Sequence, residues 1–209
     1  MMTGDATALL MIDIQNDFCP GGALAVADGD AIVPITNGLS EHFPVQVLTQ
    51  DWHPADHASF AANHSGADPF SVVQMPYGDQ VLWPSHCVQG GAGAEFHPDL
   101  ITHRTDVVIR KGYNSAIDSY SAFFENDRKT RTGLAGYLTD RGIKSLVLTG
   151  LATDFCVYFT AIDAVGLGFG VTLVSDACRA IDMDGSLDAA MADMTAKGVQ
   201  FSTSSEILA

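Results

Sequence analysis

The chain has 209 residues, enough for one domain with a full apolar core, and 47% of them are hydrophobic against 17% charged. This balance excludes a disordered chain. Asp and Glu outnumber Lys and Arg by 25 to 10, a net charge of −15, so we expect the surface to repel nucleic acids and anionic membranes.

Cysteine spacing and the N-terminal sequence bear on the compartment. Cys19, Cys87, Cys156 and Cys178 form no C-x-x-C pair and match no disulfide framework or zinc finger. The first residues do not read as a signal peptide, and no apolar stretch is long enough to span a bilayer. We therefore expect a soluble, unexported protein with reduced thiols in the cytoplasm.

Short apolar runs alternate with segments of helical spacing along the chain. The run at residues 8–14 is nearly all apolar, which is typical of a strand covered on both faces of a parallel sheet. Further strands are expected at residues 45–50, 106–112, 145–149, 170–176 and 200–203, and helices at residues 29–42, 130–141, 184–197 and after Cys156. This alternation predicts a single α/β domain over residues 1–209, doubly wound, with three α/β/α layers around a mainly parallel sheet.

Cys156 follows the expected strand at residues 145–149. Thr153 and Asp154 are good N-cap residues, which places Cys156 in the first turn of a helix. Free N–H groups and the positive end of a helix favour a thiolate there, at the edge where parallel sheets bind ligands. The alternative is a small, buried apolar cysteine, which is our interpretation of Cys178.

Asp13 and Lys111 also stand at the ends of expected strands. If these strands are neighbours, Asp13, Lys111 and Cys156 converge at one edge of the sheet. In such a set the carboxylate removes the thiol proton and the ammonium stabilises the thiolate. No histidine is placed to be that base, so Asp13 takes the role, with a pKa raised by burial. The alternative for Asp13 is a structural carboxylate that caps the next loop.

A second polar set follows the strand at residues 45–50. Asp51 and His53 are two residues apart, so on an extended segment they share a face and reach one metal ion. His86 adds an imidazole from a long irregular region at residues 58–105, and such regions are usually functional. Two histidines and a carboxylate suit zinc, manganese or iron with positions left for water. The alternative for His86 is a hydrogen bond within its own loop.

Five sequence blocks run in order across nearly the whole chain. They are Asp13-Ile14-Gln15-Asn16-Asp17-Phe18, Asp51-Trp52-His53-Pro54, Trp83-Pro84-Ser85-His86-Cys87-Val88, Lys111-Gly112 and Gly150-Leu151-Ala152-Thr153-Asp154-Phe155-Cys156-Val157. Together they resemble the nicotinamidases of the isochorismatase-like cysteine hydrolase superfamily, and the second and third blocks are the more specific marks. The resemblance implies one isochorismatase-like domain with a metal- and substrate-binding loop region at about residues 51–100.

The resemblance also implies roles for individual residues. Its catalytic set maps to Asp13, Lys111 and Cys156, and its metal ligands map to Asp51, His53 and His86. A fourth ligand differs between family members, and His57 is the first candidate here, with Ser59 as a weaker one. The implied cofactor is one divalent ion, with zinc preferred and iron or manganese as alternatives.

The substrate site follows from the same resemblance. Phe18, Trp83 and Tyr120 are the expected substrate-binding residues, and Trp83 is also compatible with ordinary core packing. The family has a cis peptide bond at the position of Leu151–Ala152, where the N–H groups of Ala152 and Cys156 form an oxyanion hole. Phe155 occupies a position that varies among members, and no chemistry is assigned to it.

The implied reaction is hydrolysis of nicotinamide to nicotinate and ammonia through a thioester on Cys156, as part of NAD salvage. Pyrazinamide is an expected second substrate. The partner implied is the small-molecule substrate, with no nucleic acid and no membrane, and the sequence leaves open whether the chain forms a homo-oligomer.

Three alternatives remain open from the sequence. Another small-amide hydrolase of the same superfamily would share the Asp, Lys and Cys set. A non-haem iron oxygenase would also use two histidines and a carboxylate, but usually in the order His-x-Asp…His on an all-β fold. A non-catalytic binding module would not need the Asp, Lys and Cys set.

Overall fold

The computed structural model describes residue 4 and residues 6–209. Its centre is a six-stranded sheet in the order β5-β2-β1-β6-β7-β8, in which each neighbouring pair is parallel. The strands are β1 (Thr7–Ile12), β2 (Val45–Asp51), β5 (Val107–Lys111), β6 (Ser145–Leu151), β7 (Gly170–Arg179) and β8 (Gln200–Ser202). The predicted α/β fold with a mainly parallel sheet is confirmed.

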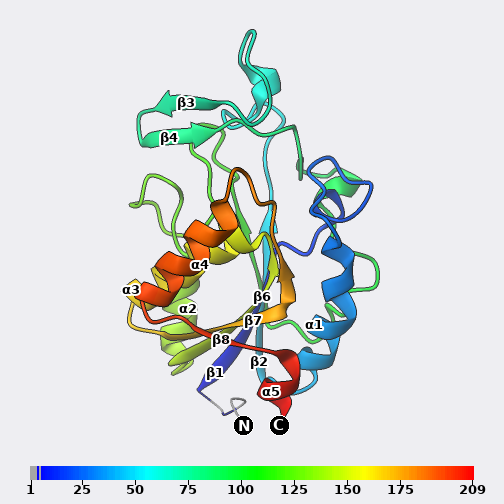
Figure 1. Cartoon of the computed structure of the whole chain (residues 1–209), viewed down its shortest axis with the longest axis vertical. Helices are drawn as coiled ribbons and strands as arrows, with labels where there is room; N and C mark the ends of the chain where they lie inside the picture. The colour runs from blue at the N-terminus through cyan, green and yellow to red at the C-terminus, as the bar shows by residue number, and fades with distance from the viewer. Residues whose placement is uncertain (1–3, 5) are drawn as a thin grey trace.

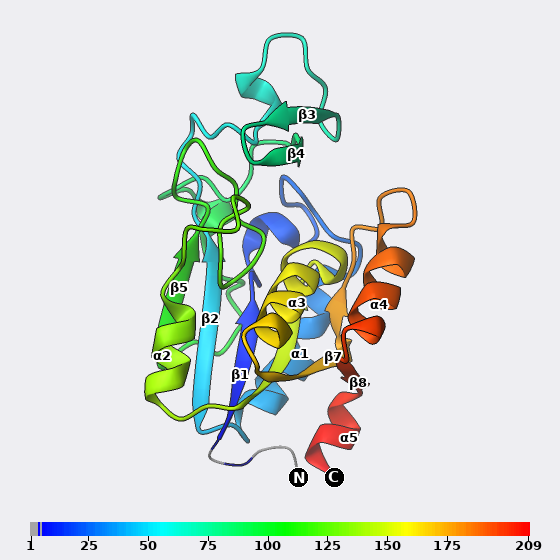
Figure 2. The ribbon, with the colours of Figure 1, turned by 90° about the vertical axis from the view of Figure 1, so that its left-hand side faces the viewer.

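Helices cover both faces of this sheet, as Figures 1 and 2 show. One face carries α1 (Val33–Ser40) and α5 (Ser204–Leu208). The opposite face carries α2 (Leu134–Asp140), α3 (Tyr158–Gly166) and α4 (Ser186–Ala196). The chain therefore has the three α/β/α layers expected from its alternating pattern.

The central strand β1 explains why its sequence is apolar throughout. Leu9 and Met11 pack into the core on the α1 side, while Leu10 and Ile12 pack into the core on the opposite side. Side chains alternate along a strand, so a strand covered on both faces needs apolar residues at every position.

A β-hairpin corrects the expectation of an irregular region at residues 58–105. Strands β3 (Val72–Met75) and β4 (Gly78–Val81) pair antiparallel and project beyond the end of the main sheet, as Figure 1 shows. The apolar runs used to predict strands are missing here because the hairpin is largely solvated, with Val72 60% exposed.

Several helix limits also differ from the prediction. Residues 29–32 form a 3-10 turn, so α1 begins later than expected. The helix expected from residue 130 begins at Leu134, after Gly133 has adopted a left-handed φ of 98°. The C-terminal α5 was not predicted, although Thr203 and Glu206 form a capping box at its start. Among the described residues, no helix is long and apolar enough to cross a bilayer.

Candidate active site

Three strand ends place reactive side chains at one edge of the sheet. Asp13 directly follows β1, Lys111 is the last residue of β5, and Cys156 lies in the turn after β6. β1 and β6 are direct neighbours, but β2 lies between β1 and β5. The strands are thus not all adjacent, and the Lys111 side chain reaches across the end of β2 to contact Asp13.

The ammonium of Lys111 joins these groups. Its Nζ lies 2.8 Å from Asp13 Oδ2 and 2.5 Å from Asp51 Oδ1. It also donates to the carbonyl of Ser119 at 2.9 Å and approaches Cys156 Sγ at 3.4 Å. Lys111 is 1% exposed, so protein groups enclose its side chain. The structure therefore brings together the three residues that the sequence singled out.

Burial and charge set the protonation of this cluster. Burial raises the pKa of the Asp13 carboxyl above its ordinary value, although the Lys111 ammonium opposes the shift. Burial alone would lower the pKa of Lys111, but Asp13 and Asp51 hold it well above its usual range. Burial raises the pKa of the Cys156 thiol well above its usual range, and Lys111 offsets only part of this.

The raised pKa of Cys156 corrects one expectation. The helix start was predicted to favour a thiolate, but the thiol is 7% exposed and two carboxylates lie within 4.8 Å of it. Removal from water and nearby negative charge both disfavour a second anion. Burial therefore favours the protonated form of Cys156, so a base beside it would assist its reaction.

The turn that carries Cys156 also differs from the prediction. Residues 153–157 form a π-helical turn, and neither Thr153 nor Asp154 caps it. The Asp154 carboxylate instead accepts hydrogen bonds from the N–H groups of Ile181 and Asp182 at 3.0 and 2.8 Å. Asp154 therefore ties the Cys156 turn to the loop between β7 and α4. The sequence suggested a helix cap because Asp154 lies close to Cys156 along the chain. Its actual partners lie in a loop that is distant in sequence, so no local pattern indicated them.

Backbone geometry before the turn allows the close approach of β6 and β1. The Leu151–Ala152 peptide bond is cis, as the resemblance implied. A Cβ on Gly150 would lie 2.0 Å from the carbonyl oxygen of Ile12, and its φ is 127°. Only glycine fits this position without displacing the strand that leads to Asp13.

Asp51, His53 and His86 form a buried group whose ligand atoms all lie within 4.8 Å of one another. Asp51 Oδ2 is 3.4 Å from His53 Nε2 and 3.6 Å from His86 Nε2. The Nδ1 atoms lie 2.9 Å from the Gly112 carbonyl and 2.8 Å from the Pro84 carbonyl, respectively. A carbonyl only accepts, so Nδ1–H donates and both Nε2 atoms face Asp51.

This arrangement fits a divalent metal ion. Two imidazole nitrogens with fixed tautomers and one carboxylate oxygen converge in a site from which water is largely excluded. Gly112 makes room for it, because a Cβ there would lie 2.3 Å from His53 Cε1. These three residues could hold the ion and leave further coordination positions for a ligand or water.

His57 and Ser59 lie beside this group. The His57 ring is tilted by 53° against the His53 ring with centroids 4.5 Å apart, and its Nδ1 is 2.7 Å from Ser59 Oγ. The ligand atoms of His57 group with His53 and Asp118, whereas the group with Asp51 does not include it. The two candidates for a fourth ligand therefore contact each other, next to the three-residue group.

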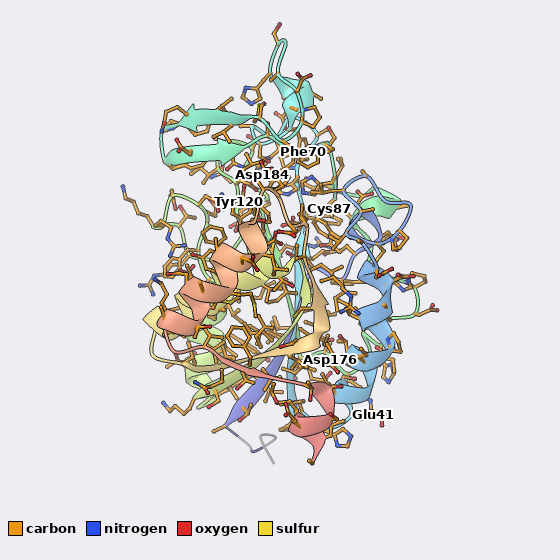
Figure 3. All side chains as sticks on the ribbon, viewed as in Figure 1. Glu41, Phe70, Cys87, Tyr120, Asp176 and Asp184 are labelled. Carbon is orange, nitrogen blue, oxygen red and sulfur yellow. The ribbon has the colours of Figure 1, made fainter. Side chains whose placement is uncertain are left out.

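An aromatic pocket opens onto both sets of residues. Its empty space amounts to about 330 Å³ with the open mouth included. The lining includes the expected Phe18, Trp83, Tyr120, Ala152 and Cys156, together with Asp51 and His86. In Figure 3, Tyr120 lies between the β3–β4 hairpin and the helical body. Trp83 Nε1 donates to Tyr120 Oη at 3.1 Å, which fixes the two rings against each other.

Four lining residues were missed from the sequence: Leu24, Asp118, Phe155 and Ile181. Phe155 precedes Cys156 and packs edge-on against Trp83 with ring centroids 5.0 Å apart. Its place directly before the nucleophile candidate was a usable signal. Asp118 and Ile181 carry no local signal, because only the fold brings their loops to the pocket.

A family comparison agrees with this geometry. The model of the isochorismatase domain matches residues 7–206. The chain belongs to the isochorismatase family. A nicotinamidase of Acinetobacter baylyi is 54% identical over 208 residues, covering 100% of this chain and 97% of the relative. The resemblance drawn from the sequence blocks is thereby confirmed.

Solved structures of the isochorismatase family have the same fold. A nicotinamidase/pyrazinamidase of Acinetobacter baumanii has a TM-score of 0.97 at 52% identity, covering 98% of this chain and 99% of that one. PnC1 of L. infantum, in complex with nicotinate, has a TM-score of 0.86 at 41% identity, covering 98% and 96%. A Pyrococcus horikoshii pyrazinamidase in complex with zinc has a TM-score of 0.78 at 35% identity, covering 95% and 99%.

Proposed function

We propose that this protein hydrolyses nicotinamide to nicotinate and ammonia, as a step of NAD salvage. One observation carries the proposal: Cys156, whose sulfur lies beside Lys111 and Asp13, lines the same aromatic pocket as Asp51 and His86 of the ligand group. Nicotinamide is a planar ring with a carboxamide and a ring nitrogen. The carboxamide matches the Cys156 side of the pocket, and the ring nitrogen matches the side lined by Asp51 and His86. The similarity to nicotinamidases over the full chain supports this substrate.

Acylation begins with the buried thiol. Asp13 accepts the proton of Cys156, and the sulfur attacks the carboxamide carbon. The N–H groups of Ala152 and Cys156 donate to the oxygen that becomes negative. Asp13 then returns the proton to the amide nitrogen, the C–N bond breaks, and ammonia leaves a thioester on Cys156. The Lys111 ammonium opposes the rise that burial causes in the pKa of Asp13, which favours its ionised form, and holds its carboxylate in place.

Deacylation reuses the same base. Water enters the place of ammonia and loses a proton to Asp13 as its oxygen attacks the thioester carbon. The C–S bond then breaks, the proton passes from Asp13 to the sulfur, and nicotinic acid leaves and loses its proton to water as nicotinate. Each proton taken by Asp13 is returned, so the residue ends the cycle as it began.

Ring binding uses the remaining residues. Phe18, Trp83 and Tyr120 enclose the ring and exclude water from the thiol. A divalent ion held by Asp51, His53 and His86 would coordinate the ring nitrogen and so orient the carboxamide toward Cys156. We propose zinc, supported by the zinc-bound pyrazinamidase with the same fold, with iron and manganese as alternatives for elemental analysis. The same contacts would accept pyrazinamide.

The test is ammonia release from nicotinamide by reduced, metal-replete protein, with Cys156→Ala as control. We expect turnover in the natural protein and none in the folded variant. Turnover retained by Cys156→Ala would remove Cys156 as the nucleophile. An inactive natural protein would reject nicotinamide as the substrate, and a panel of small amides would then identify the true one.

A further inference from the structure

Strand β2, which supplies Asp51, extends beyond the end of its neighbour β1 in the sheet. β1 and β2 remain paired up to Met11 and Leu48. The chain then turns away at Asp13, which has a left-handed φ of 49°. β2 continues to Asp51, which is 4% exposed. Buried main-chain groups at the end of β2 therefore need partners that β1 no longer provides.

The main-chain N–H and C=O groups of Asp51 lie on the side of β2 that faces β1. On the other side of β2, the N–H of Trp52 donates to the carbonyl of Lys111 at 2.9 Å. Main-chain groups of successive residues in a strand point in opposite directions within the sheet. The N–H and C=O of Asp51 thus point away from β5, toward the region beyond the end of β1.

The carboxamide of Gln15 fills that space. Its Nε2 donates to the carbonyl of Asp51 at 2.9 Å, and its Oε1 accepts from the N–H of Asp51 at 2.8 Å. The second Nε2 hydrogen goes to the carbonyl of Ala94 at 2.9 Å. Gln15 is 0% exposed, and both of its N–H donors are satisfied, so the amide has one fixed orientation. It acts as a side-chain substitute for the next residue of β1.

The position of Asp51 matters more than that of a typical strand residue. One carboxylate oxygen faces His53 and His86, and the other contacts Lys111. Metal–ligand distances tolerate errors of only about 0.2 Å. A small rotation of the Asp51 backbone would therefore disturb the metal ligands.

We propose that Gln15 is a positioning residue for the metal site, which it controls by fixing the backbone of Asp51. The inference rests on the proposed function only in taking Asp51, His53 and His86 as the metal ligands. Partners that orient metal ligands typically contribute 10- to 100-fold to metal affinity. Gln15 acts through the backbone of a ligand and makes no contact with the metal.

The chain offers a matched control in Gln50. Its Nε2 donates to the same Ala94 carbonyl at 2.8 Å, but its Oε1 accepts from Arg110 Nε at 3.0 Å. Gln15→Met and Gln50→Met each remove a buried carboxamide and one bond to Ala94. Only the first removes the two bonds to the Asp51 backbone.

The primary measurement is the dissociation constant of zinc for metal-stripped protein, by competition with a chromogenic chelator. We expect Gln15→Met to bind zinc about 10- to 100-fold more weakly than the natural protein, and Gln50→Met to stay within about threefold. The alkylation rate of Cys156 by iodoacetamide in metal-free protein should be the same in all three. With nicotinamide, we expect Gln15→Met to regain its kcat at high zinc.

Unchanged zinc affinity in Gln15→Met, or an equal loss in Gln50→Met, would overturn the proposal. If Gln15→Met does not fold, Gln15→Glu replaces it, since it keeps the acceptor for the Asp51 N–H and loses the donors. Natural affinity in folded Gln15→Glu would equally overturn the proposal. None of the binding measurements uses nicotinamide, so a failure of the proposed substrate would be seen separately.

Discussion

Lys111 contacts Asp51 as closely as it contacts Asp13, so one buried ammonium joins the candidate metal-ligand group to the candidate nucleophile cluster. Lys111→Met would leave the buried Asp13 carboxylate without a counter-charge and remove the ammonium beside Asp51. Breaking a buried pair in this way costs about 3–5 kcal/mol. We expect that loss in the free energy of unfolding, together with loss of turnover. Urea denaturation measures the first, and Lys144→Met, at an exposed lysine, should change it by less than about 0.5 kcal/mol.

The ligand group predicts different results for two neighbouring histidines. His86→Ala removes a nitrogen that faces Asp51, and we expect zinc affinity to fall by a factor of about 100 or more. His57→Gln removes a ring that contacts Ser59, and the loss should stay below about tenfold. Elemental analysis after dialysis compares the two. An empty site in His57→Gln would make His57 a fourth ligand.

Phe155 lines the pocket beside the thiol, whereas Phe159 packs against Tyr120 but does not line that pocket. Phe155→Ala removes part of the wall that encloses the ring, so we expect KM for nicotinamide to rise by about 10-fold with a smaller change in kcat. Phe159→Ala should leave KM within about threefold. Steady-state ammonia release measures both. Equal effects would mean that Phe155 acts only through packing.

Asp154 joins the Cys156 turn to the loop after β7, which carries the pocket residue Ile181. Asp154→Ala removes the acceptor for two main-chain N–H groups and for the Ser186 hydroxyl. Hydrogen bonds to a charged group contribute about 1.5–3 kcal/mol each and are not additive. We expect the variant to lose at least about 2 kcal/mol of unfolding free energy and to bind nicotinamide more weakly. Asp140→Ala, at an exposed aspartate, is the control for both measurements.

Cys178 predicts a loss of stability in alkali. The structure places it within β7, buried, as the interpretation of a small packed residue required. Burial raises the pKa of its thiol to about 12 from an ordinary 9.0. The folded state holds this proton more tightly than the unfolded state, so its contribution is complete below about pH 9 and declines as pH rises toward 12.

One such thiol lowers the unfolding free energy by up to about 1.4 kcal/mol per pH unit in that window. Urea titrations at about pH 9.5 and 10.5 should show a smaller decline in Cys178→Ala than in the natural protein. Equal declines would assign the alkaline loss to other groups. Each variant is compared with itself across pH, so the cavity left by the substitution cancels.

The α/β fold could be predicted from the sequence because the patterns that indicate strands and helices are local. A strand such as Leu9 to Ile12 is apolar at every position, and this requires cover on both faces. The β3–β4 hairpin was missed because solvated strands lack that signal. The turn at Asp154 was misread because its true partners, Ile181 and Asp182, are distant in sequence.

The sequence by itself determined the α/β fold, the family and the residues of both sets, since strand ends and motif blocks are local patterns. Only the tertiary structure decided that Lys111 reaches across the end of β2, that burial raises the pKa of Cys156, and that Gln15 substitutes for a missing strand residue. These features depend on distances between segments, on removal from water and on which main-chain groups a strand end leaves unpaired. No local pattern records such quantities, because they arise when the strands pack side by side.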